Sequence, residues 1–159
     1  MAFTLKVSAF LIGGEKLENL TTKELLRSKE EKRILTGKIS GIEDEYYKLK
    51  GEKITCAIVW YGGIKVLIPC THLGIEKINK SMIRGMLGAE IDFIVIEIDS
   101  TSNIAIASRK DAMILRSQIE FQKLKENDVV RVRILAVGVK HIIVELYGKE
   151  IIIKADNLQ

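Results

Sequence analysis

The sequence predicts a mainly β protein with short helices, in which a five-stranded module is followed by an incomplete second module of the same type. The clearest element is a β-hairpin, because two apolar, β-branched runs at residues 54–61 and 64–69 flank Gly62-Gly63. Paired glycines tolerate the positive φ angles that a tight hairpin turn needs. Pro69 then ends the second strand, since proline cannot donate a hydrogen bond to the sheet.

The same layout returns near the C-terminus, at residues 140–158. Sliding the chain by 85 positions places Val59 on Val144 and Gly63 on Gly148. A strand also precedes each hairpin, because residues 34–42 align with residues 129–137 at an offset of 95. Internal repetition of this kind predicts two related β modules.

Length and composition restrict the class of protein. The chain has 159 residues, of which 47% are hydrophobic, so it suits one or two small domains and is too apolar for a disordered chain. Its net charge of +4 is spread over 25 basic and 21 acidic residues, whereas a dedicated duplex binder carries a stronger basic excess. The longest charge-free opening run, residues 7–14, is far too short to span a bilayer. We therefore expect a cytoplasmic protein without membrane contact.

Residues 1–33 predict an N-terminal extension with one strand and one helix. Apolar residues alternate from Phe3 and then run continuously to Ile12, which suits a strand or a tail docked on another surface. Thr21 and Glu24 form a Thr-x-x-Glu capping box, in which each side chain satisfies an otherwise unpaired helical N–H. We expect a helix from about residue 22 to residue 33.

The first module is predicted over residues 34–110. Gly37 suggests a bend or bulge in its first strand, and the polar stretch 43–52 reads as a long loop before the hairpin. A short helical turn follows Pro69, and a helix over about residues 76–87 is closed by Gly88, which adopts a left-handed conformation easily. Two β-rich runs, at residues 91–98 and 104–108, complete five strands.

A linker helix over residues 111–124 leads to the second module at residues 125–159. Ser108 and Asp111 are both candidate caps for this helix. Only three strands then follow, and a barrel without its last two strands exposes an edge that proteins normally pair or cover. Either the chain is a fragment of a longer protein, or the apolar N-terminal run or a second chain fills the gap.

Several short motifs resemble the RNA-binding repeat named after ribosomal protein S1. Residues 36–42 (TGKISGI) are similar to its "GxVxxI" opening, and residues 68–73 (IPCTHL) to its "IPxSxL" segment. Residues 88–99 resemble its fourth strand, and residues 107–110 (ASRK) resemble its "LSxR" close. Residues 135–138 and 144–146 are similar to the opening strands of a second repeat. The resemblance implies a five-stranded oligonucleotide-binding (OB) barrel followed by an incomplete one.

The resemblance also implies a ligand. Members of this family bind single-stranded RNA on the outward face of strands two and three, where aromatic side chains stack on bases and basic side chains hold phosphates. This sequence departs from that pattern, because the two aromatic positions hold Thr55 and Ile58 in the first module and Lys140 and Ile143 in the second. Lys154 takes the place of the family's exposed His in the second module.

Trp60 is the first candidate for a replacement stacking platform. It lies two residues beyond Ile58 and should share its face, because strand side chains alternate. Lys65 is expected beside it across the hairpin. The alternative is a tryptophan packed against the linker helix or the N-terminal run.

A second candidate is an aromatic and basic cluster where the first strand approaches the second. Acidic residues 43–45 precede it and would repel phosphate, so a solvated loop is the competing interpretation. The cluster consists of Tyr46, Tyr47, Lys48, Lys50 and Lys53.

The second module supplies further candidates for phosphate contact. Arg131 and Arg133 alternate with apolar residues and should share an exposed face, with Lys140 and Lys154 nearby. Arg109 belongs to the segment that resembles the family's closing motif, and we include it on that basis. A solvated strand face is the competing interpretation for these side chains.

No phosphate-cradling loop, zinc-binding His pair or nucleophile triad is found in the sequence, so we expect no enzymatic activity, metal or cofactor. We expect weak, low-specificity binding of single-stranded RNA through tandem S1-type folds, in association with the ribosome or another protein. The rival hypothesis is a protein-docking module that buries Ile58 and Ile143 against a ribosomal, phage or self partner. Self-association would use the open second barrel.

Overall fold

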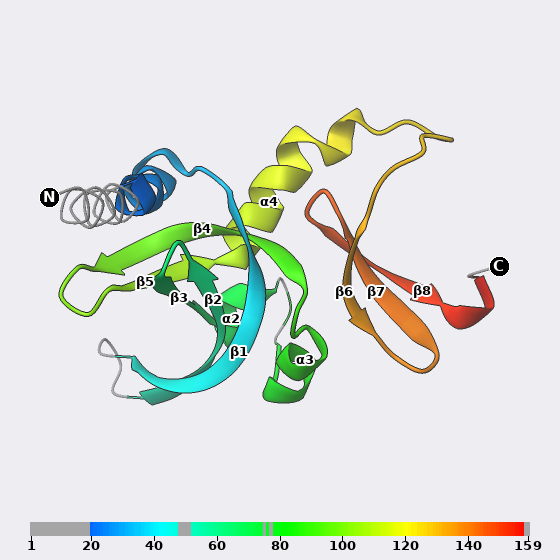
Figure 1. Cartoon of the computed structure of the whole chain (residues 1–159). Coiled ribbons are helices and arrows are strands. Elements are labelled where there is room, and N and C mark those ends of the chain that lie inside the picture. The colour runs from blue at the N-terminus through cyan, green and yellow to red at the C-terminus, as the bar shows by residue number, and fades with distance from the viewer. Residues whose placement is uncertain (1–19, 48–51, 75, 77, 158–159) are drawn as a thin grey trace, which may run out of the picture.

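The computed structural model describes residues 20–47, 52–74, 76 and 78–157. The protein is mainly β, as the sequence predicts. A closed five-stranded barrel and a three-stranded sheet lie side by side, with helix α4 (Arg109–Ile119) leading from one to the other (Figure 1). The strand predicted near the N-terminus lies outside the described residues.

The barrel has the strand order β1-β2-β3-β5-β4. Neighbouring strands are antiparallel except β3 and β5, which are parallel. Gly62 and Gly63 form the β2–β3 turn with φ angles of 54° and 86°, so the predicted hairpin is confirmed. The strands are β1 (Leu35–Tyr47), β2 (Glu52–Tyr61), β3 (Ile64–Pro69), β4 (Glu90–Asp99) and β5 (Ile104–Ser108).

Strand β1 is longer than predicted and curls along the barrel (Figure 1). Residues 43–47, predicted as part of a loop, continue to pair with β2 up to Tyr47 opposite Glu52. The hydroxyl of Thr55 donates to Asp44 across this pair at 2.8 Å. Local composition suggested a loop here, but cross-strand pairing extends the strand.

The barrel core consists of the inward-facing side chains of every strand. Val59 on β2, Val66 on β3 and Phe93 on β4 are fully buried, and Tyr61 packs edge-on against Phe93 with ring centroids 5.9 Å apart. Burying such side chains contributes about 1.5–3 kcal/mol each. This core holds the strands on whose outer face the first candidate site lies.

A helix at residues 20–31 closes one end of the barrel (Figure 1). Leu25 is fully buried in the barrel core, and the hydroxyl of Tyr61 donates to Glu24 at 3.0 Å. The backbone N–H of Val95 donates to the hydroxyl of Ser28 at 3.0 Å. Thr21 already lies inside the helix, so the predicted capping box does not mark its start.

The remaining helices are short. Helix α2 (Cys70–Leu73) is the predicted turn after Pro69, and α3 (Lys80–Gly85) is shorter than predicted because the Asn79 side chain caps its start by accepting from the N–H of Met82. Ser108 caps α4 by accepting from the N–H of Asp111 at 3.0 Å, which confirms one of the two predicted caps. Two 3-10 turns complete the list, η1 (Phe121–Lys123) and η2 (Ala155–Asn157).

The second sheet has the order β6-β7-β8 and repeats the first three strands of the barrel. With the predicted offsets, Ile39 corresponds to Ile134 and Val59 to Val144, and the structure pairs Ile39 with Val59 and Ile134 with Val144. In both strand pairs a register shift follows directly after the isoleucine. This confirms the internal repeat. Residues 129–132, predicted as strand, precede β6 without joining it. The strands are β6 (Arg133–Val137), β7 (His141–Leu146) and β8 (Lys149–Lys154).

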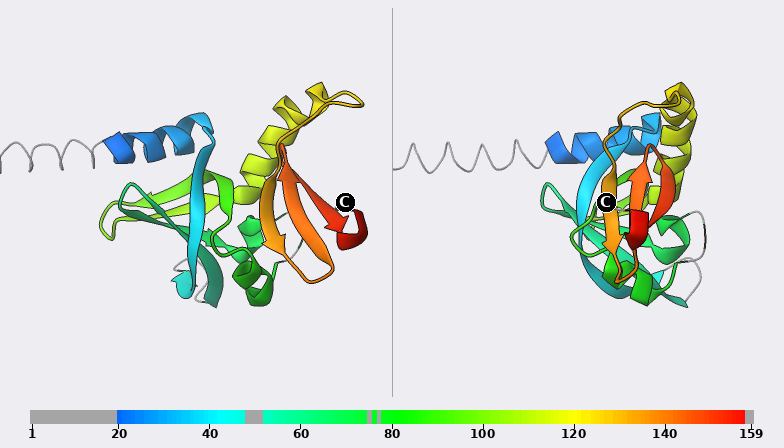
Figure 2. Two further views of the ribbon diagram at one scale, coloured as in Figure 1. Left: turned by 45° about the vertical axis from the view of Figure 1, so that its right-hand side comes forward. Right: turned by 90° about the vertical axis from the view of Figure 1, so that its right-hand side faces the viewer.

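One face of this sheet packs against the barrel (Figure 2). Leu135 is buried in the barrel's own core cluster, and Ile143 packs on that cluster. The two β modules therefore share an apolar contact, and polar groups surround it. Within the described parts of the chain, no helix is long and apolar enough to cross a membrane.

Candidate nucleic-acid interface

The outer face of the β2–β3 hairpin carries Trp60. Its side chain is 59% exposed, and Lys65 lies directly opposite it on β3. Ile58 and Leu67 lie on the same face, where they pack into a small apolar cluster with Cys56. The predicted side-by-side placement of Trp60 and Lys65 is confirmed. The alternative, a tryptophan packed against another element, is wrong because most of the ring is open to solvent.

Lys65 contacts another strand of the barrel as well as solvent. Its ammonium forms an ion pair with Glu43 on β1, and its side chain is mostly buried. Glu43 therefore offsets the positive charge beside Trp60. The indole ring, rather than the lysine, is the feature of this face that is most available to a ligand.

Asp44 lies farther along β1 and binds two side chains. The ammonium of Lys80 on α3 donates to Asp44 at 2.8 Å, and the Thr55 hydroxyl donates at the same distance. The hydrogen bond from Lys80, followed by that from Thr55, lowers the pKa of the Asp44 carboxyl. Thr55, one of the two residues of β2 that the sequence aligned with aromatic positions of the ribosomal repeat, is therefore engaged within the protein.

The predicted aromatic and basic cluster is only partly described. Tyr46 pairs through its backbone with Lys53, which is exposed. The side chains of Tyr46 and Tyr47 lie outside the described part of the structure, as do residues Lys48 and Lys50. The role of this cluster stays a prediction.

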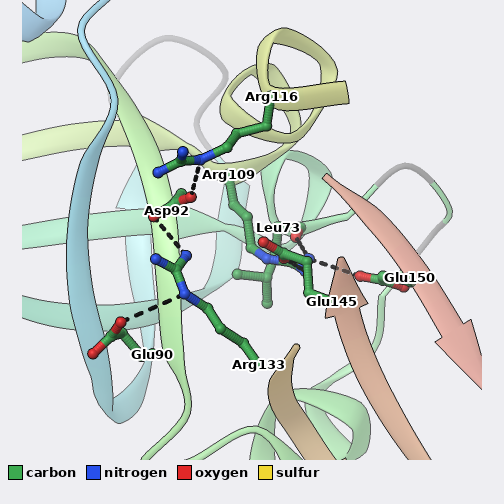
Figure 3. Close-up of polar contacts among 8 residues, drawn as sticks. All are labelled: Leu73, Glu90, Asp92, Arg109, Arg116, Arg133, Glu145 and Glu150. Carbon is green, nitrogen blue, oxygen red and sulfur yellow. Dashed lines mark hydrogen bonds and ion pairs between the residues drawn. The ribbon is translucent and has the colours of Figure 1, made fainter. Parts of the chain in front are cut away.

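Arg109, at the start of α4, is not at the surface. Its side chain is fully buried between the barrel and the second sheet (Figure 3). The guanidinium donates to the carbonyl oxygen of Leu73 at 2.7 Å, to Glu150 at 2.8 Å and to Glu145, which is also buried. The expectation that Arg109 contacts RNA is wrong, because a residue in this position joins the two modules.

Arg133 is also a junction residue. It donates to Asp92 on β4 at 2.7 Å and lies 3.5 Å from Glu90 (Figure 3). Asp92 is buried and accepts two more hydrogen bonds, each of 2.7 Å, from Arg116 on α4 and Thr36 on β1. Burial alone would raise the pKa of Asp92, but these three donors outweigh it and hold the pKa below its usual value. Arg133, which the sequence predicts on an exposed strand face, is thus half-buried in a contact with β4.

A cavity of about 230 Å³ opens at this junction. Arg131 is exposed at its wall and forms no ion pair with any residue that the structure describes. It remains the one predicted arginine of the second module that is available to a phosphate group. The cavity is lined by Asp92, Arg116, Arg131, Val132, Arg133, Glu145 and Tyr147.

Lys140 and Lys154 lie at the opposite end of the second sheet. The backbone N–H of Ala155 donates to the carbonyl oxygen of Lys140 at 2.9 Å, and Lys154 is paired with His141 next to it. Both lysines are exposed. They lie near Val137, the last residue of β6, whereas Arg133 is its first residue and Arg131 precedes it, so the four predicted cations do not form one patch.

The second module uses its equivalent outer face for docking onto the barrel. At the offset of 85, Trp60 corresponds to Glu145 and Lys65 to Glu150, and both glutamates bind Arg109. Sequence reasoning missed this function. A signal existed, because Glu145 and Glu150 fall opposite each other in the repeated hairpin, and like charges in that position destabilise a sheet unless a cation lies between them.

Compared with known proteins, the sequence matches no family model and no curated protein.

Proposed function

We propose that the barrel is an OB fold and that the protein binds single-stranded RNA, without catalysis, on the outer face of β2 and β3. The strand order β1-β2-β3-β5-β4 with parallel β3 and β5 supports the fold, since a five-stranded Greek-key barrel of this kind binds oligonucleotides on the face of its second and third strands. The single observation that carries the proposal is the exposed ring of Trp60 on that face.

The affinity should be low. Stacking on one aromatic ring contributes about 1–3 kcal/mol per base and tolerates any base, because every base has a π-face. The pairing of Lys65 with Glu43 removes one phosphate contact from the same face. The proposal therefore specifies weak binding with little sequence preference. The resemblance of residues 34–110 to the ribosomal repeat favours a cytoplasmic RNA of the translation apparatus as the partner.

The rival protein-docking hypothesis named Ile58 and Ile143 as the docking residues, and both are occupied. Ile58 is buried with Cys56 and Leu67, and Ile143 packs on the barrel core. Neither side chain is free to meet a partner. The packing of these two side chains within the protein is the reason why we prefer the RNA proposal to this form of protein docking.

Fluorescence titration tests the RNA proposal directly, because Trp60 is the single tryptophan of the chain. A labelled twelve-residue oligouridylate at low salt should quench the emission of Trp60, and added salt should weaken the binding. Trp60→Ala should weaken binding, measured by anisotropy of the label, about 5- to 150-fold, which corresponds to the loss of one stacked base.

Two variants make this test specific. Trp60→Phe keeps an aromatic face and should retain most of the affinity. Met82→Ala removes an exposed apolar side chain from α3, which is part of neither β2 nor β3, and should bind like the unmodified chain. The proposal fails if Trp60→Ala binds RNA as well as Met82→Ala does, or if no binding occurs at low salt.

A further inference from the structure

The cavity between the two modules, which we call the junction pocket, has three arginines on its wall. Arg116 comes from α4, Arg131 from the segment before β6, and Arg133 from the start of β6. At about 230 Å³ the pocket is smaller than the roughly 300–1,000 Å³ of sites for drug-sized ligands, so it suits one small chemical group. A small pocket with several guanidinium groups is suited to an anion, because the guanidinium fork matches the oxygens of phosphate.

The three arginines keep N–H groups that the protein itself does not use. Arg116 and Arg133 bind carboxylates through Nε and Nη1 only (Figure 3). Their Nη2 atoms form no hydrogen bond with the residues that the structure describes, and the exposed guanidinium of Arg131 forms none either. Within the described ranges, Arg109 Nε is the sole buried side-chain nitrogen without a partner, so the two Nη2 groups reach solvent. Donors from all three arginines are therefore available to a ligand.

Two carboxylates also line the junction pocket, and each is engaged within the protein. Asp92 accepts three hydrogen bonds, and Glu145 binds the buried Arg109. Three arginines against two carboxylates leave the lining with a formal charge of +1. Glu90 and Glu120 pair with the same arginines at partly exposed positions, where salt screens their charge. We therefore expect modest affinity for an anion, with strong dependence on salt.

Tyr147 adds an aromatic ring to the wall of the pocket, on a strained backbone. Its φ of 44° lies in the left-handed region, which is unfavourable for a residue with a side chain. At the repeat offset of 85, Gly62 takes this place in the first hairpin turn, with a φ of 54°. The turn itself therefore needs no side chain at this position, and strain of this kind is concentrated at functional sites. An aromatic ring here can contact the base or the sugar of a nucleotide.

We propose that the junction pocket binds the phosphate group of a nucleotide, with the nucleoside against Tyr147. The three arginines donate N–H groups to the phosphate oxygens, and the unpaired fork of Arg131 supplies a bidentate contact. A free nucleotide and one residue of an RNA chain present the same chemistry, and the experiment separates these two sources. The inference does not rest on RNA binding at Trp60, because the pocket is built from α4, β4 and the second module.

NMR titration of the ¹⁵N-labelled full chain with uridine monophosphate tests the proposal. The amide signals of Arg131, Arg133 and Tyr147 should shift, uridine without phosphate should leave them unchanged, and added salt should weaken binding. Arg131→Gln should weaken binding about 10- to 150-fold, the loss expected for one partner of charge-assisted hydrogen bonds. Arg27→Gln is the matched control, since Arg27 is exposed on the helix at residues 20–31 and does not line the pocket.

Tyr147→Gly separates the ring from the phosphate contacts. The variant should fold, since glycine occupies the equivalent position of the first turn. It should weaken the binding of uridine monophosphate several-fold and leave the binding of inorganic phosphate unchanged. Equal affinity of the unmodified chain for uridine monophosphate and inorganic phosphate would assign the pocket to a bare anion and overturn the proposal.

A twelve-residue oligouridylate without terminal phosphates identifies the source of the nucleotide. Shifts at the pocket with this probe place an RNA chain there, and shifts with uridine monophosphate alone assign the pocket to a free nucleotide; both results support the proposal. Absence of these shifts with both probes, or equal affinity in Arg131→Gln and Arg27→Gln, overturns it. Quenching of Trp60 by RNA is a separate readout, so failure here leaves the RNA proposal intact.

Discussion

The first three strands of the barrel and the three strands of the second sheet share one register, yet they bury opposite faces. In β1–β3 the inner face is closed by β4 and β5, and the outer face holds the exposed Trp60. In β6–β8 the outer face holds Glu145 and Glu150 on Arg109, and the inner face is exposed along its two edge strands, at Ile134, Val137 and Ile151. The same three-stranded backbone thus closes a barrel through its inner face in one module and docks through its outer face in the other. The side chains on each face decide between these two arrangements.

Arg109 should be the residue whose loss separates the two regions most completely. Arg109→Met leaves the buried carboxylate of Glu145 without its partner, and breaking a buried pair in this way costs about 3–5 kcal/mol. We expect a lower urea midpoint and faster hydrogen exchange in β6–β8. The double variant Arg109→Met with Glu145→Leu removes the stranded charge and should recover much of the loss. An equal loss in both variants would contradict the role of the ion pair.

A matched pair of truncations compares the two inner faces. Ile39→Ala creates a cavity in a closed core and should cost about 2–5 kcal/mol of unfolding free energy. Ile134→Ala, at the equivalent position, removes a side chain that is already half in water and should cost far less. Urea unfolding of the two variants measures the difference. Similar losses would mean that the second inner face is covered in solution.

The two hairpin turns give a third comparison. Gly63 and Gly148 have φ angles of 86° and 80°, so alanine at either position meets left-handed strain of about 1–2 kcal/mol. Only at Gly148 would the new Cβ also overlap the carbonyl oxygen of Met113 in α4, whereas at Gly63 the space is open. Thermal unfolding should therefore show a larger loss for Gly148→Ala. Equal losses would argue against the contact between this turn and α4.

The smallest expected effect is a pH dependence at the junction. The pKa of Asp92 is lower in the folded protein than its usual value of about 3.9, so its stabilising contribution is complete above that value. It is lost as the pH falls from about 3.9 through the lower folded pKa, because the unfolded chain then binds more protons. Asp92→Asn should flatten this acid limb in urea midpoints measured between pH 5 and the acid transition. The same slope in both proteins would exclude Asp92 as its source.

Local signals predicted the fold well and the junction poorly. The Gly62-Gly63 turn and the Ser108 cap depend on neighbours in the chain, and both are confirmed. The repeat offsets, which come from comparing two stretches of the sequence, are confirmed as well. The extension of β1 past Glu43 depends on pairing with β2, which composition does not show.

The candidate site follows the same division. Trp60 and Lys65 were placed correctly, because alternation within a hairpin fixes their face. Arg109 was misplaced, since a resemblance to a closing motif says nothing about Glu145, which lies 36 residues away. Only the opposed glutamates of the second hairpin hinted at a buried cation between the modules.

Strand β5 passes into α4 without a spacer, because Ser108 is both the last residue of the strand and the cap of the helix. The orientation in which α4 begins is therefore fixed by strand β5 of the barrel. One added residue at this joint would rotate everything beyond it by about 100°, given 3.6 residues per turn. The number of residues at this joint thus decides whether Arg109 faces Glu145 and Glu150.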